Sequence, residues 1–123
     1  MSRDIFVQDI PASVRSVDEI PEDWMPSPLA FTAAAVIDSA KVHSAGVDDS
    51  DPSWIRITEQ GLDIELSLAD ETPLMSFAIH DRSSDRPASD RFIAGILADL
   101  GARAFDPEGS DSGIFEASDS SPH

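Results

Sequence analysis

The sequence contains no cysteine, no tyrosine and no asparagine, and its single lysine is Lys41. Without cysteine, a disulfide framework, thiol catalysis and cysteine-based zinc sites are excluded. Long apolar runs are missing as well, since none approaches the roughly 18 residues that a membrane span needs. Residues 1–4 lack the charged and apolar regions of a signal peptide. We therefore expect a cytoplasmic protein that does not insert into membranes.

Positive charge is scarce, because 8 Lys and Arg residues stand against 24 Asp and Glu residues, a net charge of −16 over 123 residues. Nucleic-acid binding depends on basic side chains that neutralise phosphates, so direct nucleic-acid binding is not expected. The hydrophobic share of 41% and charged share of 26% are typical of a globular protein. High negative charge also keeps a protein soluble and monomeric whatever its role. The acidity can therefore be compositional, and the chain a generic soluble domain.

The first part of the chain predicts a strand, a loop and a helix. Residues 4–10 carry β-branched and aromatic side chains and end at Pro11, which favours a strand at a sheet edge. Residues 11–28 hold four prolines and predict an irregular loop. Ser27-Pro28 is typical of a helix N-terminus, and apolar residues at helical spacing predict a helix over 29–44.

Three strand-like runs follow, at residues 54–58, 62–68 and 74–80, and each alternates apolar with polar side chains. The connections between them are short, and Gly61 in the first is free to adopt a positive φ. We therefore expect an antiparallel three-stranded meander.

A second helix is expected to begin at Ser89 as its N-cap and to end at Gly101. Residues 103–105 can add a short strand. From residue 108 to 123 Ser, Asp and Gly dominate, which predicts a mobile acidic tail, although Ile114-Phe115 could dock against the body.

This order of elements predicts an α+β fold in which residues 1–107 form one domain. We expect a two-layer sandwich, with an antiparallel sheet of three to five strands and two helices on one face. The other face would contact water. By the alternation, that open face carries Trp54, Arg56, Thr58, Asp63, Glu65, Ser67, Ser76, Ala78 and His80. It can be a contact surface, or its basic side chains can simply offset its acids across the strands.

Recognisable catalytic and metal-binding motifs are absent. The histidines lack the spacing of a helical metal site, and there is no nucleophile elbow or phosphate-binding loop. The segment 49–60 departs from a calcium-binding loop, because Pro52 intrudes and Gln60 replaces the bidentate glutamate. We therefore predict no enzyme, no metal and no cofactor. A small enzyme, as a third hypothesis, would need a pocket around His80 with Asp or Ser within hydrogen-bond reach.

Two tryptophans follow clusters of acids, Trp24 after residues 18–23 and Trp54 after residues 48–51. An exposed aromatic side chain ringed by carboxylates suits a basic protein partner, because the ring supplies burial and the acids speed encounter. Both tryptophans could instead cap the core. The predicted partner-binding residues are Asp18, Glu19, Glu22, Asp23, Trp24, Asp48, Asp49, Asp51, Trp54, Arg56, Asp63, Glu65 and His80.

The segments 3–9, 51–57, 77–80 and 100–107 look like those of a group of small acidic uncharacterised bacterial proteins. In size and charge the chain is also similar to immunity proteins of bacterial toxin systems, which bind and block a cognate toxin. The resemblance implies a non-enzymatic inhibitor of a basic toxin or enzyme and supplies no catalytic residues. The alternative is an acidic nucleic-acid mimic that blocks a DNA-binding protein, which the clustered spacing of the acids favours less.

Overall fold

The computed structural model describes residues 3–10, 19–51, 53–68, 74–106 and 114–116. In these ranges the strands are β1 (Arg3–Gln8), β2 (Val47–Asp48), β3 (Trp54–Glu59), β4 (Leu62–Leu68), β5 (Ser76–Asp81), β6 (Arg103–Phe105) and β7 (Ile114–Glu116). The helices are α1 (Ala33–His43) and α2 (Arg86–Leu100). Neither of these described helices is long and apolar enough to cross a membrane.

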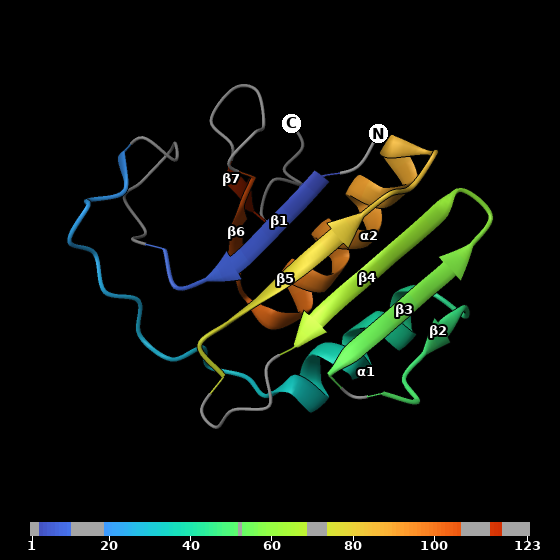
Figure 1. Cartoon of the computed structure of the whole chain (residues 1–123), viewed down its shortest axis with the longest axis horizontal. Helices are drawn as coiled ribbons and strands as arrows, with labels where there is room; N and C mark the ends of the chain where they lie inside the picture. The colour runs from blue at the N-terminus through green and yellow to red at the C-terminus, as the bar shows by residue number, and fades with distance from the viewer. Residues whose placement is uncertain (1–2, 11–18, 52, 69–73, 107–113, 117–123) are drawn as a thin grey trace.

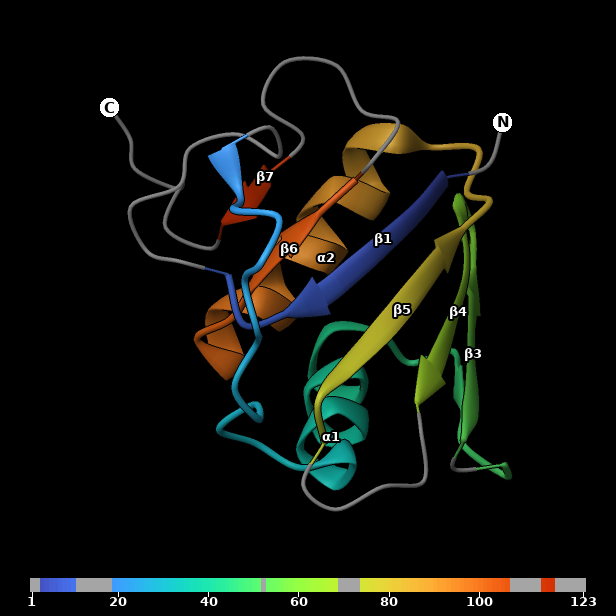
Figure 2. The ribbon, with the colours of Figure 1, turned by 60° about the vertical axis from the view of Figure 1, so that its left-hand side comes forward.

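The strands form one antiparallel sheet in the order β2-β3-β4-β5-β1-β6-β7. Both helices pack against the same face of this sheet (Figures 1 and 2). The predicted α+β class is therefore confirmed, and so is the meander of β3, β4 and β5. The predicted strand count was too low, because the described residues alone form a sheet of seven strands and not three to five.

The two strands that the sequence did not indicate are the edge strands β2 and β7. They span only two and three residues, too few to show an alternating pattern. Their neighbours define them, since Val47 pairs with Ile57 of β3 and Ile114 pairs with Phe105 of β6. Strand β7 lies within the segment expected to be a mobile tail, and the rest of 108–123 is outside the described residues.

Strand β1 is not the edge strand that was predicted. It lies inside the sheet, paired with β5 on one side and with β6 on the other. Its Ile5 and Val7 side chains are fully buried. The prediction rested on Pro11, but the strand already ends at Gln8, so no proline interrupts its ladder of hydrogen bonds. Pro11 itself lies outside the described residues.

Helix α1 begins four residues later than the predicted start at residue 29. Thr32 is its N-cap, and the Thr32 hydroxyl accepts a hydrogen bond from the Ala35 N–H at 3.2 Å. The preceding segment is held outside the helix because the Leu29 N–H donates to the Leu74 carbonyl at 2.9 Å. This bond places Leu29 and Phe31 against the core.

Helix α2 begins earlier than predicted, with Asp85 and not Ser89 as its N-cap. The Asp85 carboxylate accepts from the Ala88 N–H at 3.1 Å, and Pro87 fits the first turn. Ser89 is completely buried in that turn. The predicted end is confirmed, because Gly101 follows the helix in the left-handed conformation with φ 63°.

The core fills the space between the sheet and the helices. Every second side chain of the inner strands points into this core, and one side of each helix packs against it. Its completely buried members are Ile5, Val7, Val36, Ala40, Ile55, Ile57, Ile64, Leu66, Ile79, Ile93, Ile96, Leu97 and Ala104. The helices thus cover one face of the sheet and leave the other open.

A buried ion pair ties the start of β1 to the end of β5 and to the first turn of α2. The Arg3 Nε donates to the Asp81 carboxylate at 2.8 Å, and Nη2 donates to Asp90 at 2.6 Å and to Ser89 at 3.1 Å. The Asp81 side chain is 1% exposed. Burial alone would raise the pKa of Asp81, but hydrogen bonds from Ser83 and Arg3 hold that pKa below its usual value.

The open sheet face as the candidate functional site

The alternation predicted from the sequence defines the open face. In β3, exposed Trp54, Arg56 and Thr58 alternate with buried Ile55 and Ile57. In β5, the core positions are likewise buried, whereas Ser76 is exposed and Ala78 and His80 are half-buried. The structure therefore places the sequence-predicted face where it was expected.

The strand register arranges the open face in rows that run across the strands. One row, here called the polar row, aligns Arg56 with Glu65, Glu65 with His80, and His80 with Asp4. The register thus brings three of the predicted site residues together. It also adds Asp4 from β1, which no sequence argument had connected with them.

Next to it lies a second row, here called the aromatic row. It aligns Trp54 with Ser67, Ser67 with Ala78, Ala78 with Phe6, and Phe6 with Phe105. The rings of Phe6 and Phe105 contact each other with centroids 5.6 Å apart. Large aromatic side chains therefore stand at both ends of the row, with the small Ser67 and Ala78 between them.

Glu65 is the one member of the polar row that is almost covered, with a side chain 11% exposed. The Arg82 Nη2 donates to it at 2.6 Å, and the Arg56 Nε lies 3.5 Å from its other oxygen. Burial opposes ionisation, but hydrogen bonds from Arg82 and Trp54 and the charges of both arginines hold the pKa of Glu65 below its usual value. Its charge is thus compensated within the protein and is not presented to a partner.

Trp54 leans across the sheet and stacks on His80. The ring centroids are 5.5 Å apart and the planes differ by 23°. His80 lies two strands away, about 10 Å across the sheet. The indole must therefore extend over β4 to reach it. The residue nevertheless remains 40% exposed. On its other side the His80 Nδ1 lies 2.8 Å from the Asp4 carboxylate.

Of the acids that precede Trp54, Asp48 lies opposite Arg56 at the edge of the same face, whereas Asp49 contacts Lys41 of α1. Asp48 and Asp51 each accept two hydrogen bonds from the serine two residues later, and both carboxylates are exposed. Hydrogen bonds from Ser50 lower the pKa of Asp48, and those from Ser53 lower the pKa of Asp51. The Lys41 ammonium lies 2.7 Å from Asp49 and is the main cause of the lowered pKa of that carboxyl.

The acids around Trp24 lie at the other end of the molecule. The Trp24 indole donates to the Asp9 carbonyl at 2.8 Å, just beyond the end of β1, and so anchors its own segment. Glu19, Glu22 and Asp23 belong to the same segment, far from β2 and β3 (Figure 1). The structure therefore separates the two predicted tryptophan clusters, and Asp18 lies outside the described residues.

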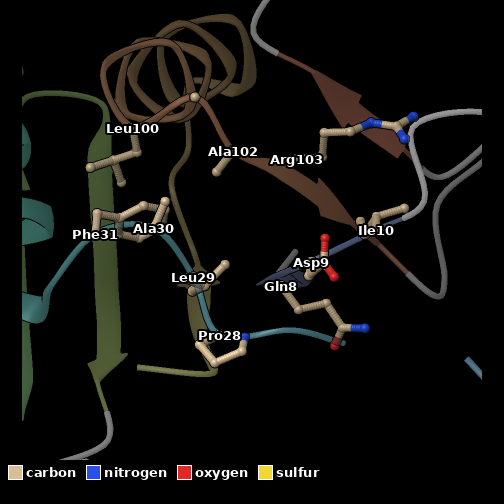
Figure 3. Close-up of a pocket in the computed structure, with 11 residues that line it drawn as sticks. Gln8, Asp9, Ile10, Pro28, Leu29, Ala30, Phe31, Leu100, Ala102 and Arg103 are labelled. Atoms are coloured by element: carbon tan, nitrogen blue, oxygen red, sulfur yellow. The ribbon is translucent and has the colours of Figure 1, made fainter. Parts of the chain in front are cut away.

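A cavity of about 240 Å³ lies near this Trp24 segment (Figure 3). It is formed where residues 8–10, 28–31 and 100–103 meet, and apolar side chains such as Leu29, Phe31 and Leu100 line it. None of the predicted partner-binding residues lines this cavity. The small-enzyme hypothesis required a pocket around His80 with an acid or a serine within hydrogen-bond reach. Asp4 is such an acid, but His80 does not line this cavity.

A Ser, a His and an Asp also meet between the two helices. The Ser39 hydroxyl donates to the Asp99 Oδ2 at 2.8 Å, and the His43 Nε2 lies 2.9 Å from the same oxygen. The single hydroxyl proton of Ser39 points at the carboxylate and not at the imidazole, so His43 is not placed to activate the serine as a base. This cluster joins α1 to α2.

Three features of the face escaped the sequence argument: Asp4, Arg82 and the Phe6–Phe105 pair. The signal for Asp4 and Phe6 was present, because they alternate with the core residues Ile5 and Val7. What the sequence could not supply was the neighbour of β1, since sheet order is a long-range property. Among the described residues, no group of three or more side chains could hold a metal ion.

Comparisons with known proteins found no matching family model, no similar curated protein and no similar solved structure.

Proposed function

We propose that this chain is a non-enzymatic, monomeric protein-binding module of the cytoplasm, and that its open sheet face inhibits a basic toxin or enzyme in the manner of an immunity protein. The observation that carries the proposal is the position of Trp54. Of the large apolar side chains described, Met25, Val42 and Trp54 are exposed, and Trp54 is the aromatic one. Exposed tryptophans dominate the binding energy of many interfaces.

The surroundings of Trp54 support a positively charged partner. Asp48 and Asp51 are exposed beside it, and Asp4 is 59% exposed beyond His80. Arg56 and Arg82 both contact Glu65 directly, and their charges also act on Asp48 and on Asp4. Carboxylates at the rim of an interface mainly raise the association rate and make it depend on salt.

Inhibition would then be steric and electrostatic. The indole is buried against the partner, the sheet face covers the partner's working surface, and the acids at the rim meet its Lys and Arg side chains. The antiparallel face needs no rearrangement to do this, because the stack on His80 already holds the ring.

Affinity capture with paired tryptophan variants tests this proposal. Tagged wild type, Trp54→Ala and Trp24→Ala are incubated with nuclease-treated lysate of the source organism at low and high salt. We expect one basic, salt-sensitive partner that wild type and Trp24→Ala retain and that Trp54→Ala loses. Equal retention by Trp54→Ala would contradict the assignment, as would unchanged binding after Asp48, Asp49 and Asp51 are reversed to Lys.

The same experiment distinguishes the nucleic-acid mimic. Added duplex DNA displaces a mimic from its partner, because both occupy one site. An immunity-type inhibitor that binds away from the nucleic-acid site stays bound.

A further inference from the structure

The aromatic row and the acid next to it form a surface suited to one kind of side chain. Ala78 is its centre, with Phe6 beside it on β1 and Ser67 beside it on β4. The Trp54 indole extends over β4 and stacks on His80, which lies two residues from Ala78 on the same face of β5. Asp4 lies two residues from Phe6 on the same face of β1 and faces His80.

We propose that the partner places an arginine side chain on Ala78, with its guanidinium between the rings of Trp54 and Phe6 and hydrogen-bonded to Asp4. This inference rests on the proposed function and names the group that the open face recognises. A planar guanidinium stacks on aromatic rings and at the same time donates to a carboxylate. An aliphatic side chain would use the rings but leave Asp4 unused.

The charges of the face favour Asp4 as the carboxylate that receives the arginine. Glu65, the other acid of the polar row, is nearly covered and is neutralised by Arg56 and Arg82. Asp4 is more than half exposed, and of its two oxygens Oδ1 faces His80. A carboxylate has acceptor capacity for several hydrogen bonds, so Asp4 can accept from His80 and from a guanidinium together.

Arginine fits this surface better than lysine. The lysine ammonium is a compact, strongly hydrated charge, whereas the guanidinium is planar, more weakly hydrated and able to donate in parallel to a carboxylate. Exposed stacking of a cation on a ring contributes about 0.5–1 kcal/mol, which corresponds to roughly a two- to fivefold change in affinity. The arginine preference should therefore be measurable even with an isolated amino-acid derivative.

The test uses N-acetyl-arginine amide, with N-acetyl-lysine amide and sodium chloride at equal ionic strength as controls. NMR follows the Ala78 methyl group, the Phe6 ring and the Trp54 indole of the full chain. We expect saturable shifts at these three residues with the arginine derivative, and binding at least about threefold weaker with the lysine derivative. Equal affinity for both, or shifts that spread over the exposed acids without saturating, would overturn the proposal.

Variants of matched charge sharpen the result. Asp4→Asn should weaken binding of the arginine derivative by about threefold or more, whereas Asp38→Asn, which removes the same charge from the exposed side of α1, should not. Ala78→Leu keeps all charges and should abolish the saturable shifts by occupying the space. If Asp4→Asn perturbs the amide spectrum of the sheet, the Ala78→Leu result decides.

This experiment is independent of the capture experiment. If a basic partner binds through Trp54 but the arginine derivative does not bind at Ala78, the arginine contact is wrong and the proposed function stands. If the derivative binds and no Trp54-dependent partner is found, the surface recognises arginine and the inhibitor function is wrong.

Discussion

The two faces of the sheet are built from the same strands but differ in burial and in the share of polar side chains. The covered face is mainly aliphatic, with Ile55, Ile57, Ile64 and Leu66 fully buried under α1 and α2, and its buried Asp81 is paired with Arg3. The open face alternates with it and carries a tryptophan, two arginines bridged by one glutamate, and a histidine bonded to an aspartate. Stability therefore resides mainly on the covered face, and recognition can be altered on the open face at small cost.

The largest loss of stability should follow from a cavity created in the core at the covered face. Ile64→Ala, in the middle of β4, should lower the free energy of unfolding by about 2–5 kcal/mol, because the packed core relaxes only partly around the lost atoms. Thr58→Ala on the open face should change it by less than about 0.5 kcal/mol. Urea denaturation measures both, and similar losses for the two variants would contradict the division of roles.

A smaller loss of stability should follow when the buried charge of Asp81 is removed. Asp81→Asn should cost about 1–3 kcal/mol at pH 7, because Arg3 loses a buried charged partner. The folded-state pKa of Asp81 lies below its unfolded value, so its stabilising effect is complete above the unfolded pKa and is lost as pH falls through the folded pKa. The difference in unfolding free energy between wild type and Asp81→Asn should thus shrink below about pH 4. A difference that stays constant down to pH 2 would contradict this role.

Changes to the ion pairs of the open face should cost less again. Glu65→Gln removes the charge that Arg56 and Arg82 share, and its effect on the unfolding free energy should stay below about 1 kcal/mol, since both arginines reach solvent. The near-ultraviolet circular dichroism of Trp54 should change, because Glu65 lies directly opposite His80, on which the indole stacks. A Trp24→Phe background isolates that signal, and an unchanged spectrum would show that Glu65 does not hold the ring.

The smallest effect is expected at the surface pair of Lys41 and Asp49. Its atoms lie 2.7 Å apart, but both side chains are about half exposed, so water and salt screen the attraction. Lys41→Met should leave the denaturation midpoint unchanged within error, at low salt and at high salt alike. A salt-dependent loss would show that the β2 edge depends on this contact.

Features of the fold that depend on neighbouring residues could be predicted from the sequence. Features that depend on contacts between distant residues could not. The alternation in residues 54–58 and 62–68 fixed both faces of the central strands, and Gly61 and Gly101 adopt the positive φ that their turns require. The predicted starts of both helices were wrong: α1 begins after Thr32, because Leu29 bonds to distant Leu74, and α2 begins after Asp85, which caps it in place of Ser89. The local signal at Ser27 could not reveal the contact with Leu74, whereas at α2 two local caps, Asp85 and Ser89, competed and the earlier one begins the helix.

The candidate site shows the same limit. Trp54, Arg56, Glu65 and His80 were assigned to one face from their alternation alone, and the register brings them together. Asp4 completes the polar row only because β1 inserts between β5 and β6, a pairing between residues more than 70 positions apart. The acids around Trp24 were grouped with those around Trp54 by composition, and the fold places them at the other end of the sheet.

Site-specific photo-cross-linking tests the central claim, that the open face docks a basic protein, most directly. A photoreactive amino acid is placed at Thr58 on the open face or at Val42, which is exposed on α1 beyond the covered face. We expect Thr58 to cross-link one basic protein in nuclease-treated lysate at low salt, less at high salt, and Val42 to cross-link none. Cross-linking of the same protein from Val42 and not from Thr58 would show that the helix-covered side, and not the open face, is the surface that binds.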